Sequence, residues 1–384
     1  MADKIKKTTT VIALIVCALI YWSAPRALHG QSQEQRSTPL SKWRPAREFP
    51  GVGYVGSSVC AQCHKDEAQN FFTTPMAHAS AKVSDCDLLI ARPRLAFKEG
   101  PFSYEIARRG QQSIYTVSDG AQSISEPILY CFGEGSEGQT YIFEHSGALY
   151  EGRVSFFRES GNLDITILHP RSVPKSLEAA LGRRMSQEAA QGCFSCHSTA
   201  AVSRSKLQLD SVAPGVSCEA CHGPGEKHLA AVKAKNFNDL QIFSPRLLDS
   251  FDLSQEFCGA CHMSFEQVIA MPDQGGINNV RFQPYRINSS RAHFLNDPRM
   301  SCTACHDPHD NLKHEARFYD SKCLACHLSA STETRTEERN ASPCPVARQL
   351  CVTCHMPKVE VAEMHFKFTD HWIRVVKTGE PVPK

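Results

Sequence analysis

The hydrophobic pattern begins with an unbroken apolar run over residues 11–22, which follows three lysines within residues 4–7. A run of this length is short for a bilayer span, and a basic flank before it is typical of an export signal. Arg26 lies where small residues would favour cleavage, so an uncleaved inner-membrane anchor is the alternative. We therefore expect residues 1–30 to be an export signal or N-terminal anchor. The rest of the chain is then periplasmic or otherwise exported, with any membrane contact made through residues 11–22.

Between residues 94 and 168, apolar and polar positions alternate with the period of β-strands. Glycine-containing turn signals separate the alternating stretches. This pattern predicts an antiparallel meander of five or six strands. The alternating stretches are Phe102-Tyr104-Ile106, Ile128-Tyr130-Phe132, Tyr141-Phe143 and Ile165-Ile167, and the turn signals are Glu99-Gly100, Arg109-Gly110, Asp119-Gly120, Ser146-Gly147 and Gly161-Asn162.

Within this segment, Gly133-x-Gly135-x-x-Gly138 has the spacing of a dinucleotide-binding fingerprint. That fingerprint requires a strand, a loop and then a helix, whereas the strand pattern here resumes at Tyr141. We therefore interpret the segment as a glycine-rich loop.

The composition is that of a globular protein, with 41% hydrophobic and 21% charged residues among 384. Basic and acidic residues are nearly balanced, at 42 and 40, which gives no electrostatic footprint for nucleic acid. The exceptional number is 18 cysteines, accompanied by 17 histidines. So many thiols in one chain must mostly be bonded to something.

Seven Cys-x-x-Cys-His motifs account for 14 of the 18 cysteines. Two thiols three positions apart can each add to one vinyl group of the same porphyrin, and the adjacent histidine can then ligate the iron. The motifs predict seven covalently attached c-type haems (heme c). They are Cys60-Cys63-His64, Cys193-Cys196-His197, Cys218-Cys221-His222, Cys258-Cys261-His262, Cys302-Cys305-His306, Cys323-Cys326-His327 and Cys351-Cys354-His355.

Disulfides and zinc sites are the alternatives to haem at these cysteine pairs. A disulfide framework gives no reason for a histidine after every pair. Zinc sites join two ligand pairs, and seven pairs cannot couple off evenly. Of the cysteines outside the motifs, Cys17 lies in the export segment, and Cys86, Cys131 and Cys344 remain. Cys86 and Cys131 are the first candidates for a disulfide, with buried free thiols as the alternative.

The motifs are distributed unevenly, and this predicts the domain organisation. Six of the seven lie within residues 193–355, too few residues to build a conventional core around each haem, so the porphyrins must supply much of the buried apolar surface. We expect an α+β fold of low secondary-structure content, in which a haem-packed domain of short helices and loops carries an inserted β meander. The predicted parts are a linker at 31–50, a first haem segment at 51–93, a β-rich insert at 94–170 and a six-haem domain at 171–376.

Nine histidines remain outside the motifs once His29 of the export segment is set aside, enough to supply a second axial ligand to all seven irons. Bis-histidine haem is saturated, which suits electron transfer. Each distal histidine is expected to serve a neighbouring haem, because the chain beside a motif already holds the proximal face. His169 and His314 are left open, His145 is not expected to ligate, and Met76, Met263, Met300 and Met356 are alternative ligands. The predicted distal ligands are His78, His228, His293, His309, His365 and His371.

Several stretches around the motifs form a recognisable set. They are Tyr54-Val55-Gly56 with the first motif and Met76-Ala77-His78, Cys218-Glu-Ala-Cys221-His222-Gly-Pro-Gly-x-x-His228, Cys302-Thr-Ala-Cys305-His306-Asp-Pro-His309, Cys351-Val-Thr-Cys354-His355-Met-Pro-Lys358, Phe132-Gly-x-Gly-x-x-Gly-Gln-Thr-Tyr141 with Gly147-x-Leu149-Tyr150, and Thr369-Asp370-His371-x-Ile373. Through them, most of residues 54–376 resembles exported bacterial multihaem c-type cytochromes related to the nitrifier tetrahaem cytochrome c. Some members of that group carry tetratricopeptide repeats, and no such region is recognisable in this chain. The resemblance implies bis-histidine haems packed in parallel or near-perpendicular pairs, and it supports His78, His228, His309 and His371 as ligands.

These features favour an electron carrier with no catalytic residues over an enzyme. The alternative is a multihaem oxidoreductase with one open haem that acts on a small nitrogen or sulfur oxyspecies. Expected partners are other redox proteins, such as membrane quinol-oxidising or outer-membrane cytochromes, and not nucleic acid. Removing residues 1–30 takes away four basic residues and one acidic residue, so the formal net charge changes from +2 to −1. Haem propionates add further negative charge, which favours a basic docking surface on a partner.

Overall fold

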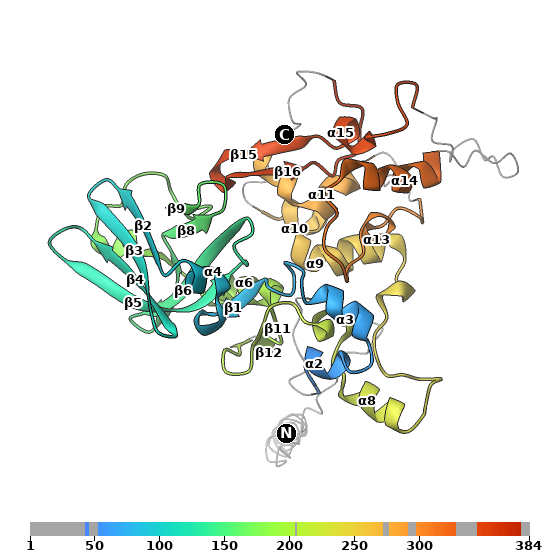
Figure 1. Ribbon diagram of the computed structural model, residues 1–384, viewed down its shortest axis with the longest axis horizontal. Helices are drawn as coiled ribbons and strands as arrows, with labels where there is room; N and C mark the ends of the chain where they lie inside the picture. Colours follow the sequence, from blue (N-terminus) through green and yellow to red (C-terminus); the bar gives the residue numbers. More distant parts are fainter. Residues whose placement is uncertain are drawn as a thin grey trace, which may run out of the picture. The chain divides into compact units, whose positions relative to one another are not determined.

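The computed structural model describes residues 43–45, 53–203, 206–271, 276–290, 297–327 and 344–377. The chain divides into residues 1–37 and residues 38–384, and all described residues belong to the second unit. The predicted export segment, almost all of the predicted linker and His293 lie outside the described residues. The fold is α+β, with short helices and antiparallel sheets (Figure 1).

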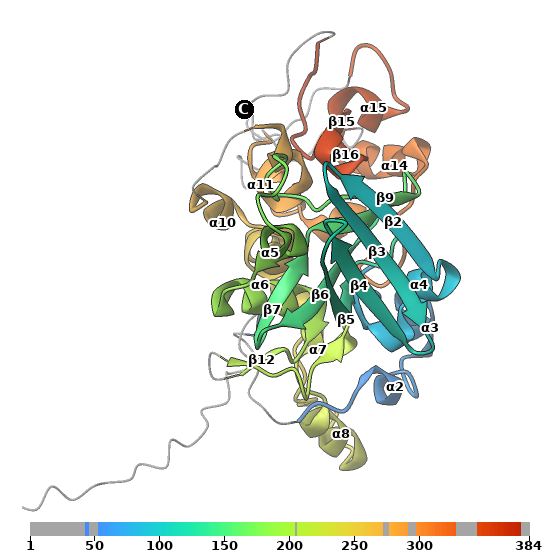
Figure 2. The ribbon, with the colours of Figure 1, turned by 90° about the vertical axis from the view of Figure 1, so that its left-hand side faces the viewer.

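An antiparallel meander forms where the alternating pattern predicted strands (Figure 2). Each strand pairs with the next along the chain from β2 to β7. In β3, buried residues alternate with half-buried ones over most of the strand, because one face of the sheet covers the core. The strands are β2 (Arg94–Glu99), β3 (Phe102–Arg109), β4 (Gln112–Ser118), β5 (Ser123–Phe132), β6 (Gly138–His145) and β7 (Ala148–Gly152).

Four further strands extend the sheet. The hairpin of β8 (Val154–Phe157) and β9 (Asn162–Ile165) pairs with β6 through β8. β1 (Ser80–Lys82) pairs with β5, and β10 (Gly182–Arg184) pairs with β7. The strand at Ile165 stops there, short of the expected Ile167. Because β1 and β10 come from the chain on either side of the meander, they join the insert to the segments that carry the first and second motifs.

The turns of this region use glycine as predicted. All five glycines in the predicted turn signals have positive φ, a backbone conformation that costs glycine little. The glycine-rich stretch is a loop between β5 and β6. At Gly133, with φ of 87°, an added Cβ would lie 2.5 Å from the carbonyl oxygen of Gly138, so the loop closes too tightly for a side chain there.

Short helices make up most of the regular secondary structure in the rest of the described chain, and loops connect them. The helical segments are α2 (Ser57–Cys60), α3 (Lys65–Phe71), η2 (Val83–Asp85), α4 (Asp87–Ala91), α5 (Leu177–Leu181), α6 (Gln187–His197), α7 (Cys218–His222), α8 (Glu226–Lys233), η3 (Pro245–Leu247), η4 (Asp252–Cys258), α9 (Gly259–His262), α10 (Phe265–Ile269), η5 (Ile277–Arg281), α11 (Gln283–Asn288), α13 (Cys302–Cys305), α14 (Ala316–His327), α15 (Cys351–His355) and η6 (Ala362–Met364). Two-residue strands pair as β11 (Ser198–Thr199) with β14 (Ala213–Pro214) and as β12 (Val202–Ser203) with β13 (Lys206–Leu207), and a longer hairpin joins β15 (Lys358–Val361) to β16 (Phe366–Thr369).

The apolar cores of the two regions differ in size. The core of the meander contains 17 buried residues, among them Tyr104, Tyr115 and Phe143. The helical region has small clusters instead, such as the four buried residues Trp43, Phe243, Leu253 and Phe257. A region with this little protein core fits the expectation that bound porphyrins supply apolar surface there.

Cys86 and Cys131 lie side by side in the core of the meander, where both are buried and present as free thiols. The Cys86 thiol also donates to the side-chain oxygen of Gln139 at 3.1 Å. The two cysteines first considered for a disulfide are therefore neighbours in the core, where the structure has them as two thiols and not as a disulfide.

Candidate haem-binding sites

The chain positions each pair of motif cysteines through a short helix or helical turn. The third, fifth and seventh motifs begin α7, α13 and α15, and the second and sixth end α6 and α14. The first begins at the end of α2, and the fourth crosses from η4 into α9. Cysteines three positions apart on a helix lie on the same face, so both thiols of a pair can meet one porphyrin edge.

Three motif histidines have their Nδ1 atom against a backbone carbonyl. His197 Nδ1 lies 3.0 Å from Ala79 O. His222 Nδ1 lies 3.0 Å from Phe243 O, and His355 Nδ1 lies 2.9 Å from Arg374 O. A carbonyl only accepts, so the proton is on Nδ1 and the lone pair is on Nε2. This tautomer and orientation are what an imidazole needs to ligate a metal through Nε2.

Four of the motif histidines are also held neutral. Burial lowers the pKa of His197, His222, His262 and His306 below that of an exposed imidazole. A protonated imidazole cannot ligate iron, so the low pKa keeps these side chains available at neutral pH.

Three motif histidines lie opposite another histidine at closely similar separations. The ring centroids of His64 and His228 are 6.4 Å apart, and those of His222 and His309 are 6.1 Å apart. The third pair, His306 and His371, has a centroid distance of 6.2 Å. Two metal–nitrogen bonds of about 2 Å and two imidazole ring radii of about 1.1 Å would place coaxial rings about 6.2 Å apart.

The second member of two of these pairs is oriented in the same way as the motif histidines. His228 Nδ1 lies 2.8 Å from Leu240 O, and His371 Nδ1 lies 3.0 Å from Thr369 O. Burial lowers the pKa of His371 to about 4, so this imidazole is neutral. The residues present therefore fit haem: cysteine pairs share a face, neutral imidazoles carry the lone pair on Nε2, and three pairs have the separation that an intervening iron requires.

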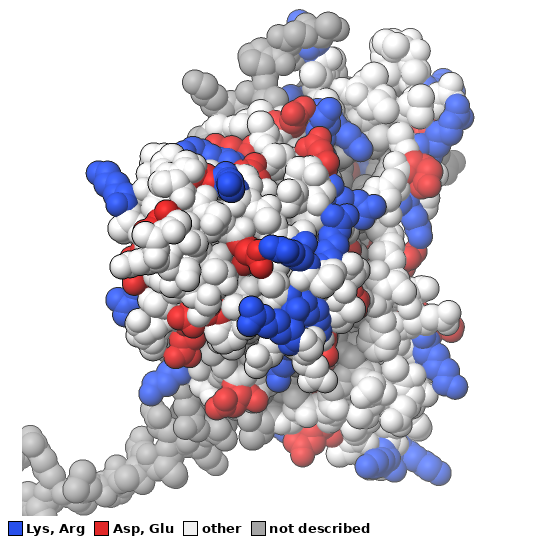
Figure 3. Space-filling model, turned by 60° about the vertical axis from the view of Figure 1, so that its left-hand side comes forward, with Lys and Arg blue, Asp and Glu red and all other residues white. Residues whose placement is uncertain are grey.

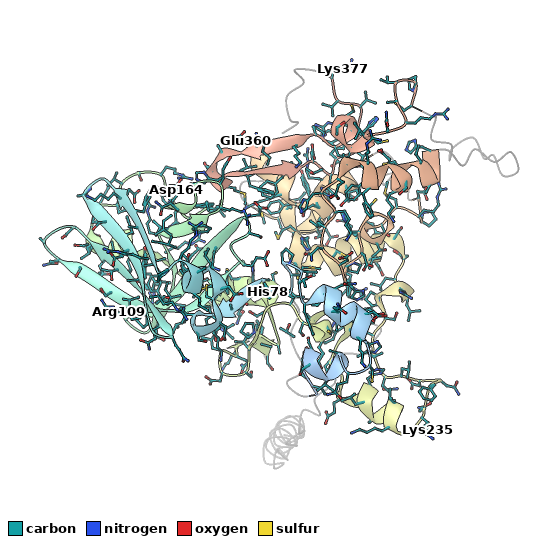
Figure 4. The ribbon with its side chains drawn as sticks, in the orientation of Figure 1. His78, Arg109, Asp164, Lys235, Glu360 and Lys377 are labelled. Atoms are coloured by element: carbon teal, nitrogen blue, oxygen red, sulfur yellow. The ribbon has the colours of Figure 1, made fainter. Side chains whose placement is uncertain are left out.

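Two predicted distal ligands, His78 (labelled in Figure 4) and His365, have their Nε2 atom engaged elsewhere. His78 Nε2 lies 2.7 Å from Phe72 O. His365 Nε2 lies 2.7 Å from Oδ2 of Asp164, and its ring packs against Phe157. Either histidine would have to exchange this contact for iron, so their role as ligands stays a prediction.

Two of the histidines left open or set aside, His145 and His169, lie in the strand region or beside it. His145 is within ion-pair distance of Glu126 and Glu178, and His169 Nε2 lies 3.1 Å from Glu151. These carboxylates occupy the ring nitrogens that a ligand would use, which agrees with the expectation that His145 does not ligate.

Glu219 is a site residue that the sequence patterns do not reveal. It occupies a variable position of the third motif and is 2% exposed. Its carboxylate accepts hydrogen bonds at 2.8 Å from the backbone amides of Val55, Gly56 and Gly225. Gly56 precedes α2, which ends at Cys60, and Gly225 precedes α8, which carries His228. One carboxylate thus fixes both the segment that leads to His64 and the segment that carries His228.

Asp370 is a second residue, after Glu219, whose role the sequence patterns do not reveal. Its position next to His371 is the only indication in the sequence. It is 0% exposed and accepts from Arg286 through both carboxylate oxygens at 2.8 Å. Arg374 and the backbone amide of Trp372 donate to it at 2.7 and 3.0 Å. These bonds clamp the backbone on both sides of His371.

A zinc site at the cysteine pairs would need three or four ligands around one centre. Within the described ranges, no three His, Cys, Asp or Glu side chains converge as a metal-ion site of that kind would require. Of the helices that the structure describes, none combines the length and apolar character needed to cross a bilayer.

Comparisons with known proteins found a matching family, a curated relative and a solved structure. Residues 167–223, which contain the second and third motifs, match the family of cytochrome c554 and c-prime. The chain is 23% identical over 218 residues to the multiheme cytochrome MtrA of Shewanella baltica (strain OS185), across 49% of this chain and 60% of that protein. It therefore spans less than two thirds of the length of that relative. The crystal structure of the outer cell wall cytochrome OcwA matches over 85% of this chain and 80% of its own, with a TM-score of 0.47 and 14% identity.

The family match and the MtrA relative support a multihaem c-type cytochrome. They imply covalently bound c-type haem, which agrees with the attachment motifs and with the paired imidazoles.

Proposed function

We propose that the protein is a heptahaem c-type cytochrome that transfers single electrons between redox partners in the bacterial cell envelope. The observation that carries this proposal is the set of three histidine pairs with centroid separations of 6.1–6.4 Å. Iron bound by two imidazoles has no vacant position for a substrate. Such iron changes charge with little change in its ligands, which suits one-electron transfer.

The residues have distinct roles in this proposal. The cysteine pairs hold each porphyrin covalently, and the motif histidines are the proximal ligands. His228, His309 and His371 are the distal ligands of the first, third and fifth haems. The carbonyls at Nδ1 fix the ring planes of five of these histidines, which are His197, His222, His228, His355 and His371.

The proposed partners are other redox proteins of the envelope, reached by docking between charged surfaces. Basic and acidic side chains are interspersed on the face shown in Figure 3, so the side chains alone set up no uniform field there. The haem propionates then give the assembled protein its net negative charge. An acidic carrier of this kind is steered towards a basic surface, and its association slows as salt is added.

Electron paramagnetic resonance of the oxidised holoprotein tests the carrier against the enzyme. A pyridine haemochrome assay gives the number of haems per chain, which we expect to be seven, and the resonance signals are quantified against it. We expect all of these haems to be low-spin ferric haem. Adding nitrite or hydroxylamine should leave the spectrum unchanged. One high-spin haem per chain whose signal shifts with nitrite or hydroxylamine would instead establish the open-haem oxidoreductase.

A further inference from the structure

Certain attachment motifs pack against each other in pairs. The first such pair is formed by the first and third motifs. Helices α2 and α7 pack together. Ser57 Oγ, one turn before the first cysteine of α2, accepts from the amide of Cys218 at 3.3 Å. The thiols of Cys60 and Cys218 are within hydrogen-bonding distance of each other. The edges at which these two haems attach are therefore adjacent.

The fourth and fifth motifs repeat this arrangement. Ser254 Oγ, again one turn before a first cysteine, accepts from the amide of Cys302 at 3.3 Å. The first cysteines, Cys258 and Cys302, are in hydrogen-bonding contact. The packing of α13 against η4 supports the same pairing.

The sixth and seventh motifs form the third pair. The carboxylate of Asp320 on α14 accepts from the amides of Leu350 and Cys351 at 2.8 and 2.9 Å. It thereby caps α15, which packs against α14. Here too the first cysteines, Cys323 and Cys351, are in contact.

Other contacts connect these pairs to one another. The second motif meets the fourth, because Cys196 contacts Cys261, its Sγ lies 3.8 Å from Ala260 O, and α6 packs on α9. Cys221 of the third motif and Cys258 of the fourth pack against one apolar cluster. The fifth motif meets the sixth, since α13 packs on α14 and the ring of His306 lies 5.7 Å from that of Tyr319.

The fourth motif therefore contacts two others and shares an apolar cluster with a third, whereas each remaining motif has such links to one or two others. We propose that the seven haems form a branched relay with the fourth haem at its junction. One arm is the second haem, another runs through the third haem to the first, and the longest runs through the fifth and sixth to the seventh. The inference rests on the proposed electron-transfer function and adds to it the order in which electrons pass.

A direct step from the third haem to the fifth is the competing route, because His309, a ligand of the third haem, follows the fifth motif closely. That contact is made through an axial imidazole on the distal side of His222. The contacts of the fourth motif involve the thioether cysteines, which are joined to the porphyrin edge itself. The route through the fourth haem therefore brings porphyrin edges closer together.

A branched relay has three ends where a linear one has two. Electrons that enter at the first and second haems meet at the fourth before they reach the seventh. A branched relay therefore offers redox partners three points of electron exchange, at the first, second and seventh haems.

Iron positions in a crystal structure of the holoprotein, located by anomalous scattering, test the branching. We expect the six shortest iron–iron distances to join haems 1 and 3, 3 and 4, 2 and 4, 4 and 5, 5 and 6, and 6 and 7. Fewer than three of these distances at haem 4 would overturn the branching. The low-spin spectrum could stand in that case, so failure of the branching and failure of the carrier are distinguishable.

A kinetic experiment tests the junction in solution. Cys344 is an exposed free thiol near the seventh motif, and backbone amides of Ala347 and Val346 lower its pKa, so it accepts a ruthenium photosensitiser. In the doubly substituted Cys258→Ser/Cys261→Ser protein, rapid photoreduction should reach three of the six remaining haems. In the Cys193→Ser/Cys196→Ser control it should reach all six. Rapid reduction of all six haems in the first variant would overturn the junction, and haem counts and circular dichroism verify that both variants fold.

Discussion

Replacing Asp370 with asparagine is expected to convert one haem per chain from low spin to high spin and to lower the free energy of unfolding by about 3–5 kcal/mol. The fully buried carboxylate balances Arg286, whose side chain is 5% exposed, and also accepts from Arg374. Asparagine offers one acceptor oxygen and turns an amide donor towards the guanidinium groups. The buried arginines then lose their counter-charge, and the backbone on both sides of His371 loses its clamp.

Glu360→Gln is the matched control for this variant. Glu360 lies in the neighbouring β15–β16 hairpin (Figure 4) and forms an exposed ion pair with Lys367 at 3.5 Å. An exposed pair contributes at most about 1 kcal/mol, so this change should leave both spin state and stability nearly unchanged. The measurements are quantified high-spin resonance and urea unfolding. If Asp370→Asn matched the control in spin state, Asp370 would have no role in positioning His371.

Replacing Glu219 with glutamine is expected to lower the free energy of unfolding by about 2 kcal/mol and to add high-spin signal from the first haem. The carboxylate accepts from three backbone amides, those of Val55, Gly56 and Gly225. A glutamine nitrogen cannot accept, so at least one buried amide loses its partner. The loss falls on the two chain segments that place His64 and His228 opposite each other.

Glu226→Gln is the control here, because Glu226 is an exposed carboxylate on the same helix as His228. It should change stability by less than about 0.5 kcal/mol and leave the spin state unaltered. A Glu219→Gln protein that lost stability but kept every haem low-spin would limit Glu219 to a structural role.

Local signals in the sequence predicted local structure well. Each attachment motif is a continuous stretch of sequence, so haem attachment can be predicted from it without knowledge of the fold. The turn glycines and the alternating strands are also local, and the structure has both. Strand pairings with the flanking segments, such as β1 with β5, join residues far apart in the chain, and no sequence period marks them.

The candidate distal ligands show what local sequence patterns could not predict. Closeness to a motif or the family resemblance singled out His78, His228, His309 and His371, and the structure places the last three each opposite a motif histidine from another segment. His78 and the further candidate His365 have their Nε2 atoms engaged elsewhere, that of His365 by Asp164, 201 residues away. Which nitrogen a histidine leaves free depends on such distant partners, and so do the roles of Glu219 and Asp370.

Near-infrared magnetic circular dichroism of the oxidised holoprotein tests the central claim most directly, because its charge-transfer bands separate bis-histidine from histidine–methionine ligation. The three imidazole pairs predict at least three bis-histidine haems per chain. The substitutions His228→Ala, His309→Ala and His371→Ala should each remove one of them. Fewer than three bis-histidine haems in the unaltered protein, or no loss from these substitutions, would contradict the account.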